Sequence, residues 1–231
     1  MTGEVRRRFH SEMEGMQADL FAMGELAAEA VRAAVGALTG HDDRAALAVI
    51  DGDDAIDELY MKIDQGTLEM LALQAPVAQD LRLVSVLLHS CLHLERIGDQ
   101  AVNIAKIQRV SSHLPGDSAT LQQIEEMGHV VVSMVRTAME ALRTRNLELC
   151  LQLPKMDDPV DRLNRNMHRQ VAQLADDPKV LDWGMHMNLV ARALERVGDN
   201  AVDIGEQVGF LLTGEFREYT DASHPVDVDE P

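Results

Sequence analysis

Apolar residues recur at steps of three and four along most of the chain, which is the spacing of one apolar face on a helix. The first stripe of this kind comprises Met16, Leu20, Met23, Ala27, Ala30, Ala34 and Leu38. The pattern continues to about residue 212, so it predicts a series of amphipathic helices.

The breaks between the apolar stretches carry residues that begin helices. Asp, Asn and Ser side chains cap the first turn, and proline is tolerated there. The breaks therefore predict six helices. The first carries the stripe above, the second starts at Asp42 or Asp43 and covers about 44–73, and the third has Pro76 near its first turn and runs to about Gln108. In the second half, the fourth helix starts at Asp117 or Ser118 and runs to about Leu142. The fifth starts at Asn146, and the sixth has Pro178 at its start and ends near Leu212.

The composition also favours helices over strands. Hydrophobic residues make up 46% of the 231-residue chain, but aromatic residues only 3%. Sheets are enriched in aromatic and β-branched side chains, whereas Ala, Leu and Met are strong helix formers. We therefore expect an all-α fold.

The second half of the chain repeats the first. Residues 94–104, LERIGDQAVNI, and residues 194–204, LERVGDNAVDI, are identical at eight of eleven positions. Upstream, DDAID and DDPVD are matched segments on the preceding helices. A duplication of this length predicts two three-helix bundles in tandem, similar to spectrin repeats. We expect the first bundle at 1–110, a linker at 111–117, the second bundle at 118–213 and a disordered acidic tail at 214–231.

Charge and cysteine content limit the compartment and the partners. The formal net charge of −18 repels nucleic acid and anionic lipid and favours cations or basic protein surfaces. Cys91 and Cys150 lack the Cys-x-x-Cys spacing, which fits a reducing compartment. The first 15 residues lack the apolar segment of a signal peptide. These features predict a cytoplasmic protein.

Acidic residues stand in line on two of the predicted helices. Positions four residues apart fall on one helix face. Like charges at this spacing destabilise a helix by about 0.2–0.5 kcal/mol per pair. A repeated acidic line therefore hints at a compensating cation. The two lines are Glu95, Asp99 and Asn103 in the first half and Glu195, Asp199 and Asp203 in the second.

Hairpin geometry brings further acids level with these lines. If the first hairpin turns near Ala75, Asp53 and Asp57 lie as far from the turn as Asp99 and Glu95 do. The two pairs therefore meet between antiparallel helices. This register predicts a cluster of four carboxylates in the first half.

The second half predicts a similar cluster, because Asp161 falls level with Glu195 across a turn near Asp176. All these ligands are oxygens, which suits Mg²⁺, Ca²⁺, Mn²⁺ or iron better than a tetrahedral zinc site. Glu25 and His129 are equivalent in the repeat, and either could add a ligand.

The alternative is a solvated acidic face in which nearby cations pair with the acids. Candidate partners are Arg96, Arg162, Arg196 and Lys62. Against this alternative, Gly98 and Gly198 each cost about 1 kcal/mol relative to Ala in a helix. The presence of a glycine at this position in both halves predicts that the facing helix approaches closely there.

These residues also carry a family resemblance. The segment DLRLVSVLLHSCLHLERIGDQAVNIAKI at 80–107 resembles the hallmark of the PhoU family, bacterial regulators of phosphate uptake. The preceding QAPVAQDLR and the second copy, LERVGDNAVDIGE, fit as well. The resemblance extends over both halves, from about Met13 to Leu212.

The resemblance implies an all-α protein without a catalytic reaction. Members of this family couple the ATPase subunit of a phosphate ABC transporter to a membrane histidine kinase and repress the phosphate-starvation response. It therefore implies a cytoplasmic homodimer that associates peripherally with membrane complexes. The family binds iron, zinc, manganese or magnesium on its acidic motif. Carried over to this chain, the implied ligands are Asp53, Asp57, Glu95, Asp99, Asn103, Asp157, Asp161, Glu195, Asp199 and Asp203.

Two departures from repeat symmetry affect the expected sites. Asn103 replaces an acid that the second half retains as Asp203, so the first site should bind a cation more weakly. Pro154 should break the fifth helix, and Pro159 could restart it. Such a break would move Asp157 out of the second cluster.

Two other functions fit parts of the sequence. One is a helical adaptor for a phosphate permease that works without metal. The other is a carboxylate-bridged di-metal oxidase, which needs Glu-x-x-His on each of two helices. Glu126 and His129 supply one such motif.

Overall fold

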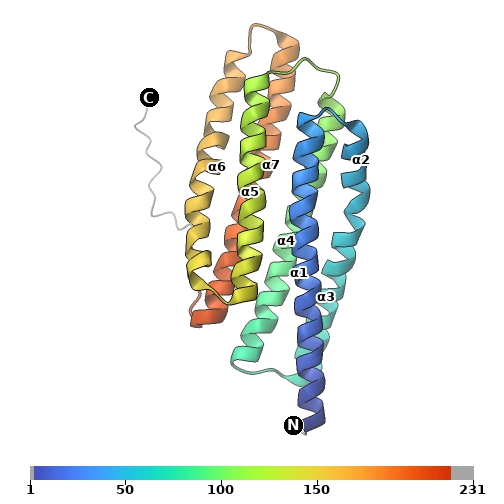
Figure 1. The fold of residues 1–231 in the computed structure, drawn as a ribbon, viewed down its shortest axis with the longest axis vertical. Helices are drawn as coiled ribbons and strands as arrows, with labels where there is room; N and C mark the ends of the chain where they lie inside the picture. The colour runs from blue at the N-terminus through green and yellow to red at the C-terminus, as the bar shows by residue number, and fades with distance from the viewer. Residues whose placement is uncertain (1–2, 220–231) are drawn as a thin grey trace.

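The structure, a computed structural model, describes residues 3–219, and helices joined by short connections make up this range (Figure 1). The predicted all-α fold of two helical bundles is therefore confirmed. The helices of the described part are α1 (Gly3–Thr39), α2 (Asp43–Gly52), α3 (Asp54–Gln74), α4 (Gln79–Ser111), α5 (Ser118–Thr144), α6 (Leu147–Gln173) and α7 (Pro178–Thr213).

The two bundles lie side by side and run in opposite directions (Figure 1). Helices α1 to α4 form the first bundle, and α5 to α7 form the second. Between the bundles, α4 packs against α7 and α1 packs against α5. Helices α2, α3 and α6 pack only within their own bundles. The interface therefore consists of two antiparallel helix pairs.

Glycines bring α1 and α5 together at two equivalent points. A Cβ atom on Gly24 would lie 2.7 Å from Met139 Cγ, and one on Gly128 would lie 2.9 Å from Val35 Cγ1. These two contacts are equivalent in the repeat, because Gly128 lies 104 residues after Gly24 and Met139 lies 104 residues after Val35. The halves are therefore related by an approximate two-fold axis that passes between α1 and α5.

Side-chain caps begin the helices where the sequence predicts them. Asp42 accepts from the backbone N–H groups of Arg44 and Ala45, and Asp117 accepts from Thr120. Asn146 caps α6 in the same way. These three predicted helix starts are confirmed.

Two helix boundaries differ from the prediction. The single second helix is divided at Asp53, just after Gly52, which has low helix propensity. Pro76 lies in the connection before α4, because Ala75 and Ala78 both adopt positive φ values of 44° and 50°. Helix α4 therefore begins three residues after Pro76.

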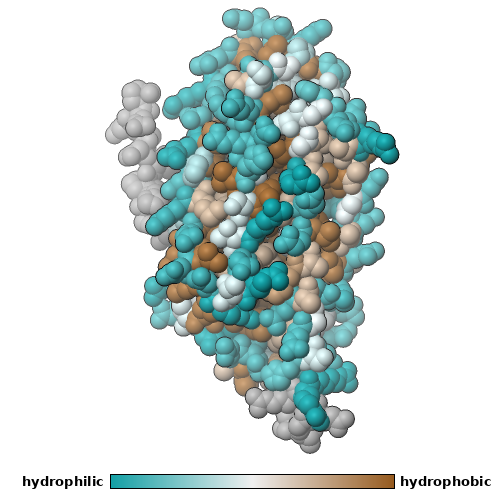
Figure 2. Space-filling model, in the orientation of Figure 1, coloured by the Kyte–Doolittle hydropathy of each residue, from teal (hydrophilic) through white to brown (hydrophobic). Residues whose placement is uncertain are grey.

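The core is mostly aliphatic and runs through both bundles. Trp183, Leu20, Leu94, Ile97 and Ile124 are among its largest fully buried side chains. Hydrophilic residues cover most of the face in Figure 2, and apolar residues form smaller patches between them. No helix in the described range is long and apolar enough to span a membrane.

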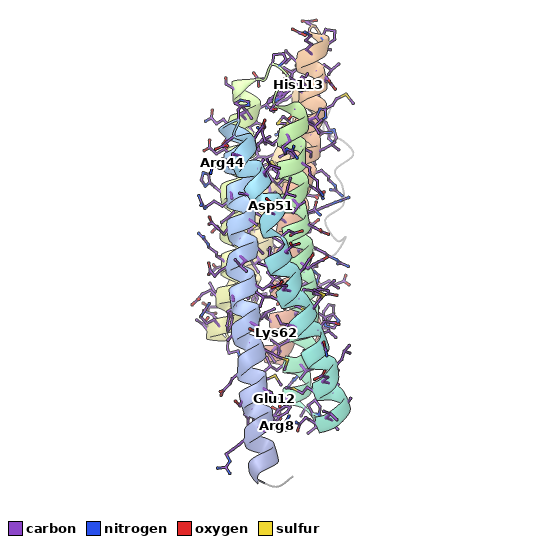
Figure 3. The ribbon with its side chains drawn as sticks, turned by 90° about the vertical axis from the view of Figure 1, so that its right-hand side faces the viewer. Arg8, Glu12, Arg44, Asp51, Lys62 and His113 are labelled. Carbon is purple, nitrogen blue, oxygen red and sulfur yellow. The ribbon has the colours of Figure 1, made fainter. Side chains whose placement is uncertain are left out.

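Charged side chains project from the helices along their length (Figure 3). On α1, Arg8 pairs with Glu12 at 2.7 Å. Lys62 on α3 pairs with Asp19 on α1, also at 2.7 Å. Lys62 is thus engaged by an aspartate outside the predicted acidic cluster.

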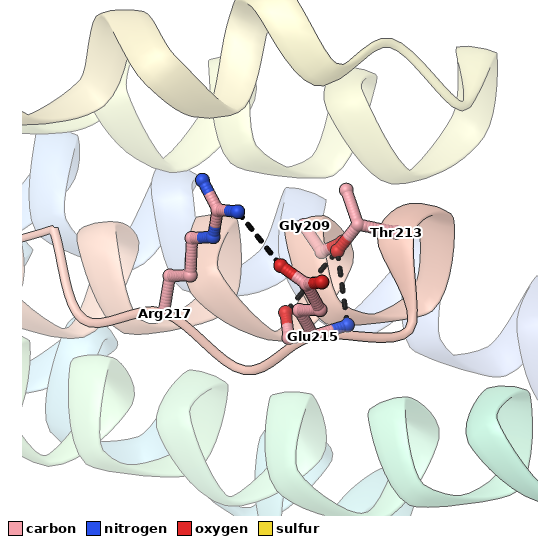
Figure 4. A network of polar contacts seen from close by, with 4 residues as sticks. All are labelled: Gly209, Thr213, Glu215 and Arg217. Atoms are coloured by element: carbon pink, nitrogen blue, oxygen red, sulfur yellow. Dashed lines mark hydrogen bonds and ion pairs between the residues drawn. The ribbon is translucent and has the colours of Figure 1, made fainter.

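The beginning of the predicted disordered tail is ordered against α7. Tyr219 donates its backbone N–H to Glu206 at 2.6 Å. Thr213 Oγ1 donates to the carbonyl of Gly209 and accepts from the N–H of Glu215 (Figure 4). Residues 214–219 therefore have no helix or strand but contact α7, and the rest of the predicted disordered tail, 220–231, lies outside the described residues.

Candidate metal centres

The first acidic cluster lies where α4 passes the α2–α3 break. Gly98 allows this approach, since a Cβ atom there would lie 3.1 Å from Asp53 Oδ1 and 3.0 Å from Ile56 Cδ1. The predicted close approach at Gly98 is confirmed. Asp53 and Asp57 are half-buried on this side.

Electrostatic coupling shows that the acids of the two helices are neighbours. The pKa of Asp53 is raised by burial and then by repulsion from Asp57 and Asp99. Burial also raises the pKa of Glu95, with further repulsion from Asp99 and Asp57. The structure therefore brings together the four carboxylates that the hairpin register predicts. Asn103 is exposed one turn further along α4.

The second cluster is more deeply buried. A Cβ atom on Gly198 of α7 would overlap Asp157 Oδ1 of α6, so the carboxylate occupies the space beside the glycine. Asp157 is 5% exposed and Glu195 is 9% exposed. Asp157 Oδ1 and Glu195 Oε2 are both buried without a hydrogen-bond partner. Such oxygens are costly to bury unless a donor or cation compensates them.

Burial and, after it, repulsion within this cluster perturb the pKa of Asp157 strongly. Burial raises the pKa of Asp157 to about 7, and repulsion from Asp161, Asp199 and Glu195 adds to the shift. The pKa of Glu195 is raised by burial and by Asp199, although Arg192 opposes the shift. The cluster thus disfavours its own full ionisation unless a cation enters.

Contrary to the prediction, α6 remains continuous through Pro154 and Pro159. Close packing against α7 explains this, because Leu153 Cδ1 occupies the space that a Cβ atom on Gly205 would take. Burial on both sides of the prolines outweighs the local cost of the missing hydrogen bonds. Asp157 therefore stays in the second cluster, where the repeat places it.

Neighbouring cations engage part of the second cluster. Glu195 Oε1 accepts from Arg192 Nη1, one turn before it on α7. Asp161 Oδ2 lies 3.6 Å from Arg165 Nη1 on α6. These two arginines are not among the ion-pair partners that the sequence predicts for a solvated acidic face. Both follow from helix spacing, because i, i+3 and i, i+4 residues are neighbours.

Asp203 has a partner that the sequence did not reveal. Its Oδ2 atom lies 3.4 Å from Nδ1 of His93, which belongs to α4 of the other bundle. The same Nδ1 atom lies 2.9 Å from Oδ1 of Asn200. Asp203 therefore joins the bundle interface as well as extending the acidic line.

The two clusters supply only oxygen atoms, which suits hard divalent or ferric cations. Among the described residues, no three Asp, Glu, His or Cys side chains are already arranged to hold a metal ion. The buried unpaired oxygens and the glycine at each crossing fit such a cation. Glu126 and His129 are exposed on α5. The equivalent residues of the first half are Ala22 and Glu25, so the repeat supplies no second Glu-x-x-His motif.

Fold and sites together define a duplicated helical-bundle protein with one acidic cluster in each half. Residues 20–108 and 124–208 each match the PhoU domain, so the chain belongs to the PhoU family. The resemblance seen in the sequence is thereby confirmed.

Relatives match over nearly the whole chain. A phosphate-specific transport system accessory protein PhoU homolog from Caulobacter vibrioides is 31% identical over 229 residues, 99% of either chain. Its counterpart from Pseudomonas aeruginosa is 32% identical and covers 97% of this chain and 91% of that protein.

Solved structures share the fold. The crystal structure of PhoU from Pseudomonas aeruginosa matches with a TM-score of 0.86 and 31% identity, over 90% of this chain and all of that one. The phosphate transport system regulatory protein PhoU from Streptococcus pneumoniae matches with a TM-score of 0.82 and 26% identity, over 90% of this chain and 99% of that one.

Proposed function

We propose that this chain is an accessory protein of a phosphate transport system and a negative regulator of the phosphate-starvation response. Membership of the PhoU family carries this proposal, with relatives named as accessory and regulatory proteins of phosphate transport. The chain bridges the ATPase subunit of the phosphate ABC transporter and a membrane sensor histidine kinase. It works as a non-enzymatic, cytoplasmic homodimer held at the membrane by these partners.

Metal binding is the second part of the proposal. A divalent or ferric cation in each cluster would neutralise carboxylates that otherwise repel each other across the helix crossing. The observation that supports this most directly is the pair of buried, unpaired oxygens, Asp157 Oδ1 and Glu195 Oε2. The ligands in the first half are Asp53, Asp57, Glu95, Asp99 and Asn103, and those in the second half are Asp157, Asp161, Glu195, Asp199 and Asp203.

A bound cation would act as a cross-link within each bundle. It would join α3 to α4 in the first half and α6 to α7 in the second. A cation at 100 times its dissociation constant stabilises the fold by about 2.7 kcal/mol. For a chain of this size, that corresponds to about 5–10 °C in Tm. Melting of the purified protein with and without a strong chelator measures the effect, and coincident melts with no metal in elemental analysis would refute it.

Affinity purification from cells grown at high and low phosphate tests the regulatory role. We expect the tagged full chain to recover the transporter ATPase subunit and the kinase, and its deletion to derepress phosphate-starvation genes in high phosphate. Neither partner recovered under either condition, with unchanged gene expression, would contradict the proposal. Recovery of a different phosphate permease by a metal-free variant would favour the adaptor alternative.

A further inference from the structure

A cavity of about 470 Å³ lies where α4 begins and α5 and α7 end. The helix ends that line it lie at one end of the long interface between the bundles (Figure 1). Asp80 and Arg82 come from the first turn of α4, and Arg145 follows α5. Apolar walls come from Leu83 and the last turn of α7. Two arginines therefore line one cavity in a chain whose net charge is −18.

Arg82 lines this cavity beside the end of α7, and it forms no ion pair among the described residues. Its Nη1 atom occupies the space of a Cβ atom on Gly214, which ends α7 with a φ of 79°. The hydrogen bonds of Thr213 Oγ1 to Gly209 before the turn and Glu215 after it fix the shape of the turn (Figure 4). Arg82 Nε is buried and has no hydrogen-bond partner. A buried cationic donor left unpaired is costly, so a ligand that accepts from it would be stabilising.

Arg145 also lines the cavity, from the end of α5. It closes α5 in the left-handed conformation, with its backbone N–H bonded to the carbonyl of Ala141. Its Nη2 atom donates to Oε1 of Gln17 at 3.0 Å, which anchors the guanidinium group. Arg145 is exposed and takes part in no ion pair among the described residues, so its guanidinium group is accessible to an anion from solvent.

Within residues 3–219, neither arginine takes part in an ion pair, and neither does Asp80. In addition, no side chain caps the first turn of α4. Unpaired N–H groups at a helix start add to the attraction for an anion. The cavity thus combines two arginines with the start of a helix.

The other end of the molecule provides an internal comparison. The repeat places Asp182 and His41 at the positions of Arg82 and Arg145, and it replaces Leu83 by Trp183, which is 1% exposed. The duplicated scaffold alone therefore does not require the two arginines. They are specific to one end.

We propose that this cavity binds inorganic hydrogen phosphate, at a site separate from the acidic clusters. Guanidinium groups match the geometry of phosphate oxygens and can donate two hydrogen bonds each. Asp80 accepts the hydrogen bond from the remaining P–OH group. Sulfate has no proton to donate at neutral pH, and a phosphate monoester loses its second proton near pH 6. The carboxylate of Asp80 therefore repels both of these anions and selects free phosphate.

Isothermal titration calorimetry of the full chain tests this site at pH 8, with a chelator present so that metal-bound phosphate does not contribute. Inorganic phosphate, sulfate and glycerol 3-phosphate are compared at equal ionic strength. We expect one phosphate per chain, and affinity for the other two anions at least about tenfold lower. Asp80→Asn should abolish this preference.

Substitution of the arginines locates the binding. Arg82→Gln and Arg145→Gln should each weaken phosphate binding by at least about tenfold. Arg109→Gln, which removes the same charge from the far end of α4, should leave it unchanged. Melting curves show whether each variant folds. If Arg82→Gln does not fold, Arg145→Gln still tests the site, because Arg145 is more exposed than Arg82. Absent binding, equal affinity for sulfate, or binding that Arg145→Gln leaves intact would overturn the proposal.

Discussion

Asp157 Oδ1 on α6 occupies the space that a side chain at Gly198 on α7 would fill. The glycine of the repeated segment LERVGDNAVDI therefore makes room for a carboxylate of the facing helix. Gly98 and Asp53 have the same relationship in the first half, with a wider separation of 3.1 Å. Each repeated segment thus carries both a line of acidic residues and the glycine that leaves space for an acidic residue of the facing helix.

Gly198→Ala should destabilise the protein and lower its metal content. The added methyl group must displace the Asp157 carboxylate, and overpacking of this kind costs about 1–3 kcal/mol. Gly98→Ala should have a smaller effect because its neighbours are further away. Urea unfolding and elemental analysis of the purified variants measure both consequences.

Gly15→Ala is the matched control, because a Cβ atom there meets nothing within 4 Å. It lies inside α1, where replacing glycine by alanine should stabilise by about 0.5–1 kcal/mol. The same gain from Gly198→Ala, without loss of metal, would show that the space beside Gly198 has no role.

The metal-free protein should become less stable as the pH rises towards 8. The pKa of Asp157 is about 7 in the folded state, because of burial and neighbouring acids, and about 3.9 in an unfolded chain. The folded state therefore binds the proton more tightly, and this stabilisation is lost as the pH rises from about 4 to 7. Melting in chelator at pH 5 and pH 8 measures the difference.

Asp157→Asn removes this contribution and should stabilise the metal-free protein at pH 8 by about 2 kcal/mol. The exposed neighbour Asp158 provides the control, since Asp158→Asn changes the same charge on the surface of α6. An unchanged pH dependence in Asp157→Asn, or an equal effect of Asp158→Asn, would mean that Asp157 is not the group responsible.

The second site should hold its metal more firmly than the first. Asp157 and Glu195 are buried, whereas their counterparts in the first half are only half-buried. In addition, Asp203 stands where the first half has Asn103. Glu195→Ala with Asp199→Ala should therefore remove more metal than Glu95→Ala with Asp99→Ala. Metal per chain after dialysis measures the two losses. Equal losses would contradict the inference from Asn103.

Much of this fold follows from local sequence rules. Helix caps such as Asp42, Asp117 and Asn146 depend on one side chain and its own helix, so they can be located without coordinates. The meeting of Asp53 with Glu95 needs only a helix rise and the position of one turn. Both predictions use interactions that are close in sequence or within one hairpin.

The parts that sequence did not predict depend on packing between distant elements. Continuity of α6 at Pro154 depends on how Leu153 packs against Gly205, which outweighs the local cost of proline. The cavity at Arg82 and Arg145 requires the two bundles to run in opposite directions. Helical periodicity is the same for either direction, so the sequence pattern carries no information about it.

The contact between His93 and Asp203 links the two bundles and leads to a last prediction. Asn200 donates its amide to the carbonyl of Arg196 at 2.7 Å, which turns its Oδ1 atom towards His93. His93 Nδ1–H therefore donates to Asn200, with Asp203 nearby. The His93 side chain is only 12% exposed, so its hydrogen bond is largely shielded from water.

His93→Ala should destabilise the metal-free protein by about 1–2 kcal/mol, because it leaves the Asn200 oxygen without its donor and removes packing between α4 and α7. His129→Ala, at an exposed position on α5, should change the free energy of unfolding by less than about 0.5 kcal/mol. Urea unfolding of His93→Ala, Asp203→Asn and the double variant completes a thermodynamic cycle. A coupling of about 0.5–1 kcal/mol is expected for side chains in contact. Strict additivity would mean that Asp203 does not interact with His93, and that its carboxylate is available to the second acidic cluster alone.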